Sequence, residues 1–326
     1  MARNLNLPIY TYEFMPIRKE NEPQLFVGKD ADEIRTTNQE LMARKQDIFQ
    51  DILNQLVEGK IIPQLDDKQY RCKTIYHQGG IVIFKMENIK DETFPWNFAT
   101  ASHKIGPNCH IIIDNRKDMQ HIAIERNPKA FSSTNQVKNI LQATFLPLMK
   151  AQGLSISICQ QYQPDEFWDF IDAHRMVGIR EVRFYFPFPN LPAISDKYGD
   201  FMKQLGLDYH CMPGMILYAP DDLDMILDRN DLGLDFYVKA AGESGIPIAV
   251  KTKAKGARTM MIGKKSSVTW PLDKSLLYSL DPAPDSAHTQ QTQLEFMQED
   301  EKAKVDGAIT EFVNRGRFMV NHTKAE

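Results

Sequence analysis

The chain has 326 residues, of which 42% are hydrophobic and 25% are charged. This composition is that of an ordinary globular protein with room for two domains, and it excludes collagen-like, coiled-coil and wholly disordered chains. Lys and Arg number 39 against 43 Asp and Glu, so the net charge of −4 neither requires nor excludes a nucleic-acid partner.

The cysteines and the apolar runs indicate the redox compartment of the protein and whether it inserts into a membrane. Four scattered cysteines predict free thiols in a reducing cytoplasm, not a disulfide framework or a structural zinc site. No apolar run approaches the length of about 18 residues that a membrane helix needs, so we expect no membrane insertion. Neither a phosphate-binding nor a dinucleotide-binding glycine motif occurs, and we expect no cofactor and no metal.

The first half of the chain predicts strands followed by helices. The expected elements are a strand at 8–14, a helix at 30–56, a hairpin of strands 72–77 and 81–88, a second hairpin of strands 109–114 and 121–126, and a helix at 132–150. Ser132 and Ser133 are suitable capping residues for this last helix, and Gly153 is a plausible boundary after it.

The second half of the chain also predicts strands followed by helices. The expected elements are strands at 154–159, 179–186, 215–218, 235–241 and 246–252, and helices at 164–177, 195–205, 221–230 and 294–318. The sequence therefore predicts an α+β fold of two mixed domains with mainly antiparallel sheets, the second ferredoxin-like or related, followed by a C-terminal helix. The expected divisions are an N-terminal domain at 1–130, a connecting helix at 131–152, a second domain at 153–280, and a C-terminal helix and tail at 281–326.

A basic segment is the strongest functional signal. Six basic residues and no acidic residue lie between positions 251 and 265. If residues 246–255 are extended, alternate side chains share a face, so Lys251, Lys253 and Lys255 project together as a row of ammonium groups. Such a row favours a polyanion, because each neutralised phosphate releases counterions. The candidate binding residues are Lys239, Lys251, Lys253, Lys255, Arg258, Lys264 and Lys265, with Lys239 joining the row if its own strand pairs alongside.

Two catalytic alternatives arise from the second hairpin. Asp114 and Glu125 are paired carboxylates of the kind a metal-dependent nuclease uses, although Asn127 stands where such enzymes carry a lysine. Arg116 and His121 have the R-x4-H spacing of helical ribonuclease domains, but here the spacing falls in a predicted turn between strands. A third alternative is a protein-interaction module that docks an acidic partner.

Short motifs along most of the chain resemble those of RexA-type phage-exclusion proteins and related phage-defence proteins that bind DNA. They are the aromatic strand with Tyr10, Tyr12 and Phe14, the hairpin around Gly79-Gly80, the strand pair of 111–114 and 122–124, the segment 239–243, and the Pro271-Leu272 exit before the last helix. The resemblance implies DNA binding without sequence specificity, a homodimer, and a sensor role with a partner effector protein. No functional residue is transferred from it.

Together these observations predict a nucleic-acid-binding protein without sequence specificity, with duplex DNA as the favoured ligand. Phosphate contacts carry little sequence information, which is why low specificity is expected. The sequence shows no standard enzyme motif, so we expect a binding protein more than an enzyme.

Overall fold

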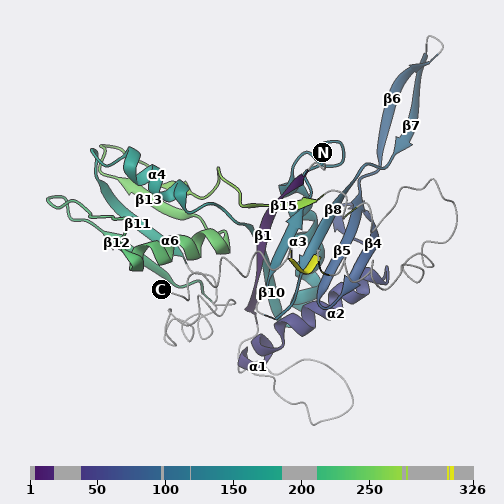
Figure 1. Cartoon of the computed structure of the whole chain (residues 1–326), viewed down its shortest axis with the longest axis horizontal. Coiled ribbons are helices and arrows are strands. Elements are labelled where there is room, and N and C mark those ends of the chain that lie inside the picture. Colours follow the sequence, from purple (N-terminus) through teal and green to yellow (C-terminus); the bar gives the residue numbers. More distant parts are fainter. Residues whose placement is uncertain are drawn as a thin grey trace.

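The computed structural model describes residues 4–17, 38–96, 99–117, 119–185, 211–273, 277, 307 and 309–311. Within them the chain has a mixed α+β fold, and every strand pair of its sheets is antiparallel, which confirms the predicted fold class. Figure 1 shows a large curled sheet and a smaller sheet, each with helices packed against it.

The large sheet is built around its first strand. In spatial order it contains β10 (Leu154–Gln160), β1 (Asn4–Pro16), β9 (His121–Ile124), β8 (Asn108–Asp114), β5 (Ile81–Glu87) and β4 (Arg71–Gln78). A seventh strand, β15 (Thr269–Asp273), pairs with the first five residues of β1. Both predicted hairpins of the first half are confirmed as β4–β5 and β8–β9.

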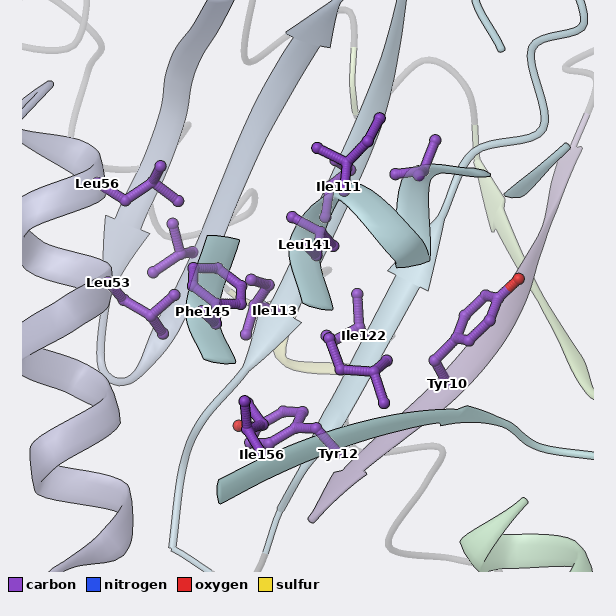
Figure 2. Close-up of a cluster of buried hydrophobic side chains, with 14 of the residues drawn as sticks. Tyr10, Tyr12, Leu53, Leu56, Ile111, Ile113, Ile122, Leu141, Phe145 and Ile156 are labelled. Atoms are coloured by element: carbon purple, nitrogen blue, oxygen red, sulfur yellow. The ribbon is translucent and has the colours of Figure 1, made fainter. Parts of the chain in front are cut away.

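Helices cover one face of this sheet. They are α1 (Asn38–Ala43), α2 (Lys45–Val57) and α3 (Thr134–Ala151). The hydroxyl of Ser133 accepts the N–H of Gln136 and caps α3, as the sequence indicated. Alternate residues of β1 point their rings at the helices, and Tyr12 packs against Phe49 of α2, which meets Phe145 of α3 at 5.1 Å. Figure 2 shows this core, which lies between α2, α3 and the sheet.

The opposite face of the large sheet is also covered. Ile83 and Ile112 lie there with Trp270 of β15, and the cluster includes Leu277 and Ile309 from the C-terminal part of the chain. Residues 307 and 309–311 are helical, while the rest of the predicted helix at 294–318 lies outside the described residues. The C-terminal part therefore contributes core residues to the sheet that begins the chain.

Among the described residues, the smaller sheet has helices on one face. Its strands, in spatial order, are β12 (Gly214–Tyr218), β11 (Ile179–Tyr185), β13 (Ile248–Thr252) and β14 (Met260–Ile262). Helices α4 (Asp165–Ala173) and α6 (Leu232–Ser244) share one core with its inner side chains. Because β12 and β13 both run antiparallel to β11 and are joined through α6, the sheet contains the split β-α-β unit of ferredoxin-like folds.

Two predicted elements between residues 221 and 241 are wrong. The predicted helix at 221–230 is a series of turns, and the predicted strand at 235–241 belongs to helix α6. Asp231 caps this helix through the N–H groups of Gly233 and Leu234, and Gly245 ends it in a left-handed conformation. Val238 and Ala241 pack on the sheet at helical spacing, so the apparent alternation was part of a helical stripe.

Four further strands form two small ribbons. They are β2 (Gln64–Leu65) with β3 (Lys68–Gln69), and β6 (Lys90–Trp96) with β7 (Ala99–Ile105). The β6–β7 ribbon projects away from the large sheet (Figure 1). The predicted helix at 195–205 lies outside the described residues. The four cysteines form no disulfide with one another, and in the described part of the chain no helix has the length and apolar character to cross a membrane.

The two sheets are joined by a hydrogen-bonded seam. Gln161 donates its N–H to Ile9 and accepts that of Val268, while Tyr162 donates its N–H to Gly242 of α6. Thr11 of β1 donates its hydroxyl to the carbonyl of Glu243 at 2.8 Å. The predicted boundary at residue 153 falls within the large sheet, because β10 and β15 both pair with β1.

Candidate nucleic-acid interface

The smaller sheet presents one face without the two helices that form its core. Side chains alternate along each strand, so the residues between the core positions point the other way. The outward residues are Glu181 and Arg183 on β11, Ile216 and Tyr218 on β12, Lys251 on β13 and Met261 on β14. Ile216 is 61% exposed and Tyr218 is 54% exposed, so apolar and aromatic groups are accessible on this face.

The three lysines predicted to form one row do not do so. Strand β13 ends at Thr252, and Lys251 alone lies on the sheet. Lys253 lies just beyond the end of the strand, where its N–H donates to the carbonyl of Gly178, and its ammonium group binds Asp224 at 3.0 Å. Lys255 follows in the exposed turn that contains the left-handed Gly256. The prediction of three aligned ammonium groups is therefore wrong, because the strand ends at Thr252, three residues before the end of the predicted extended segment.

Lys239 is also separated from the row. It lies on α6 and pairs with Asp235 one helical turn away, at 2.7 Å. Because α6 lies on the covered side of the sheet, Lys239 does not extend a row along its strands. The remaining candidates, Arg258, Lys264 and Lys265, are exposed in the turns on either side of β14.

Ion pairing divides the basic residues around the smaller sheet into two groups. Six are neutralised locally: Arg175 by Asp172, Arg180 by Asp221, Arg183 by Glu181, Arg229 by Asp165, Lys239 by Asp235 and Lys253 by Asp224. Five of the seven candidates have no acidic partner among the described residues: Lys251, Lys255, Arg258, Lys264 and Lys265. Unpaired cations are thus concentrated around β14, and we call these five residues the β14 cations.

The turn after β14 is held by a single carboxylate. Glu166, in the first turn of α4, accepts the backbone N–H groups of residues 263–266 and the hydroxyl of Ser266, with the N–H of Gly263 at 2.9 Å. Burial raises the pKa of Glu166, but the hydrogen bonds from Gly263, Ser266 and Lys265 outweigh it and leave the pKa below its usual value. Successive N–H groups that converge in this way form an anion-binding nest, here filled from within the chain. The nest fixes the backbone that carries Lys264 and Lys265.

A groove of about 720 Å³ separates α4 from β14. Phe170 lines it and stacks on the ring of His174 at 4.1 Å. Its other wall includes Met260 and Ile262, with Arg258 and Lys265 placed before and after the strand. This groove was not predicted from the sequence, although apolar residues at 170, 173 and 177 have the spacing of a second stripe along α4 and the turn that follows it.

The two carboxylates of the nuclease alternative lie apart. Asp114 faces His121 across the β8–β9 pair, whereas Glu125 binds His110 at 2.6 Å. His110 and Asp114 are four residues apart on one strand, which is about 13 Å at 3.3 Å per residue, too far to share one metal ion. Within the described residues, no group of three or more His, Cys, Asp and Glu side chains is placed to hold a metal. The geometry gives no support to this alternative.

Arg116 and His121 come together at one end of the same hairpin. Arg116 binds Asp114 at 2.9 Å, and the buried His121 packs edge-on against Trp270 at 5.4 Å between ring centres. Burial lowers the pKa of His121 to about 4, with Asp114 opposing and Arg116 adding to the shift. The Nδ1 atom of His121 has no hydrogen-bond partner in the part of the chain described. These residues belong to a turn and a core, not to the helix that ribonuclease chemistry requires.

Compared with known proteins, the sequence matches no family model and no curated protein. The resemblance to RexA-type proteins therefore stays a prediction.

Proposed function

We propose that this chain binds nucleic acid without sequence specificity, through phosphate contacts made by the β14 cations. The observation that carries the proposal is the contrast in ion pairing: around one sheet, six basic residues have local acidic partners, whereas the five β14 cations have none among the described residues. Like charges gathered in this way repel each other until a polyanion neutralises them, and counterion release then favours binding.

The spacing of the two turns suits a ligand with several phosphates. Strand β14 has three residues, which is about 10 Å at 3.3 Å per residue, and basic residues stand on both sides of it. One phosphate does not reach both turns, whereas a nucleic-acid backbone does. Duplex DNA is the expected ligand, and the exposed Tyr218 and Ile216 on the open face make single strands the alternative to compare, since bases stack on such surfaces.

Charge reversal tests the proposal. We expect the combined variant Lys255→Glu, Arg258→Glu, Lys264→Glu, Lys265→Glu to lose duplex binding by at least about a hundredfold at low salt. The slope of log affinity against log salt becomes shallower by about 0.9 for each phosphate contact removed. Fluorescence anisotropy with a duplex, its single strand and the matching RNA duplex measures both.

The matched control reverses basic residues that already have partners. Arg180→Glu, Arg229→Glu, Lys239→Glu and Lys253→Glu together reverse the same number of charges around the smaller sheet but leave the β14 cations intact, so affinity stays within a few-fold of the parent. Equal losses of DNA affinity in both variants would mean that net charge alone explains binding. Unchanged affinity in the combined variant would contradict the proposal. Circular dichroism checks that both variants are folded.

The RexA-type resemblance extends the proposal to phage defence, with a homodimer that senses DNA and acts through an effector protein. Plating efficiency of phage on cells that carry the parent gene with its neighbours, or the combined variant, tests this role. Protection that survives loss of DNA binding contradicts it. Sedimentation of the purified chain tests the dimer.

A further inference from the structure

Helix α4 carries two apolar stripes, and the core of the smaller sheet uses one of them. The core stripe consists of Phe167, Trp168 and Ile171. The second stripe, which continues into the turn after the helix, consists of Phe170, Ala173 and Val177 and lines the groove between α4 and β14. Phe170 also packs partly against the core, whereas Ala173 and Val177 are exposed. Val177 is 46% exposed. An amphipathic helix needs only one apolar stripe to pack on a sheet, so the second is available to a further partner.

The strand on the other side of the groove is an edge strand. In the part of the chain described, β14 pairs with β13 on one side and ends the sheet on the other. Met260 and Met261 are 49% and 42% exposed there. An edge strand offers N–H and C=O groups at the strand spacing, and a peptide that pairs with them extends the sheet by one strand. Such a strand would lie beneath the second stripe of α4.

The charges around the groove indicate what kind of ligand it binds. Arg258 precedes β14 and Lys265 follows it, and both lack acidic partners among the described residues. Of the two acidic residues that line the groove, Glu166 is bound to the nest and Asp169 is exposed on α4. An occupant with acidic groups at both ends and apolar groups between them matches this pattern.

We propose that the groove between α4 and β14 binds an extended acidic peptide segment of a partner protein, which adds a strand to β14. Alternate apolar side chains of the peptide contact Phe170, Ala173 and Val177, and its flanking acidic residues meet Arg258 and Lys265. The methionines suit this role, because flexible thioether side chains adapt to different apolar groups. This inference does not rest on nucleic-acid binding.

A nucleobase fits the groove less well than a peptide. Base recognition needs several polar groups aimed at the edges of the base, whereas the walls here are largely apolar carbon. The neighbouring edge strand has no role in a base pocket but supplies the backbone partners of a peptide. Binding of a small apolar molecule in place of a peptide is one of the outcomes that would overturn the proposal.

Selection from a library of random peptides displayed on phage tests the proposal directly. We expect enriched peptides with apolar residues at alternate positions and Asp or Glu on both flanks. A synthetic copy binds the full chain in fluorescence anisotropy, and methylation of its alternate backbone amides on the side that pairs with β14 abolishes binding. Methylation of the other set of alternate amides, which point away from β14, leaves binding intact. Lack of enrichment, or full binding by the peptide methylated on the β14 side, would overturn strand addition.

Two neighbouring residues provide a matched pair of variants. Val177→Asp places a charge in the groove and weakens peptide binding by at least about tenfold, the equivalent of 1.4 kcal/mol. Met176→Asp adds the same charge at a residue that is 99% exposed and does not line the groove, and it leaves binding within about twofold. Arg258→Glu and Lys265→Glu each weaken binding by up to roughly fivefold.

The outcomes separate this proposal from nucleic-acid binding. Val177→Asp retains most of the duplex affinity, because it leaves all five β14 cations in place. If the chain binds the peptide but not DNA, the proposed function is wrong and the groove proposal stands. If it binds DNA but not the peptide, only the groove proposal is wrong. Equal peptide binding by Val177→Asp and the parent would exclude the groove as the site.

Discussion

In the part of the chain that the structure describes, the two sheets differ in how many of their faces are packed against other elements. The large sheet packs α2 and α3 against one face and covers the other with β15 and residues from the C-terminal part of the chain. The smaller sheet packs α4 and α6 against one face, while the other carries Arg183, Lys251 and exposed Ile216. A sheet covered on both faces has few side chains left for a ligand, whereas a sheet covered on one face retains a full set.

Truncations that remove apolar groups test this difference most strongly. Phe145→Ala in the large sheet's core is expected to lower the free energy of unfolding by about 3–5 kcal/mol, because its fully buried ring meets Phe49. Ile216→Ala on the open face changes it by about 0.5 kcal/mol or less. Urea unfolding of both variants measures the two values. A cost above 2 kcal/mol for Ile216→Ala would show that this face is covered in solution, which would contradict the difference between the two sheets.

Local signals in the sequence were sufficient to predict six strands of the large sheet and its two hairpins, but not how β1, β10 and β15 pair. The alternation of Tyr10, Tyr12 and Phe14 predicts β1, and the turn at Gly79-Gly80 predicts the β4–β5 hairpin. These signals depend on residues close together in the chain, so periodicity alone detects them. That β15 returns to β1 across more than 250 residues is a long-range contact, which no local pattern contains.

The candidate site was predicted less well, for a physical reason. Charge composition identified the segment 251–265, but the direction of each lysine depends on where the strand ends. The ammonium group of Lys253 pairs with Asp224, and its backbone N–H bonds to Gly178, a residue 75 positions earlier in the chain, so both contacts are long-range. The groove was missed because the second stripe of α4 is visible in the sequence only once the core stripe is known.

The next largest expected effect is on the pH dependence of stability, and it comes from His121, which is buried on the second face of the large sheet. Burial lowers the pKa of His121 to about 4, against 6.5 in the unfolded chain. The unfolded state therefore takes up the proton first, and the stability that His121 contributes above pH 6.5 is lost as the pH falls toward 4. Replacement of this histidine, His121→Phe, keeps a ring against Trp270 and removes the titration.

We expect the unfolding free energy of His121→Phe, relative to the parent, to rise by roughly 2 kcal/mol between pH 7 and pH 5. The comparison with the parent is needed because burial raises the pKa of Glu243 to about 7, and that group acts in the opposite direction over the same range. Glu243 is present in both proteins and its contribution cancels. A difference that does not change with pH would mean that water reaches His121, and the second face would then resemble the open one.

The smallest effect on global stability concerns the nest that organises the cations of the smaller sheet. Glu166→Ala removes the acceptor for the N–H groups of residues 263–266, and these amides are expected to exchange with solvent at least about tenfold faster. The free energy of unfolding falls by about 1 kcal/mol or less, because the released donors bind water in an exposed turn. Asp169→Ala, on the same helix and without a part in the nest, leaves the exchange of these amides unchanged. Hydrogen exchange measured by mass spectrometry separates a local loosening from global destabilisation. If the four amides stay protected without Glu166, the turn is held by its own backbone, and Lys264 and Lys265 are positioned by the sheet alone.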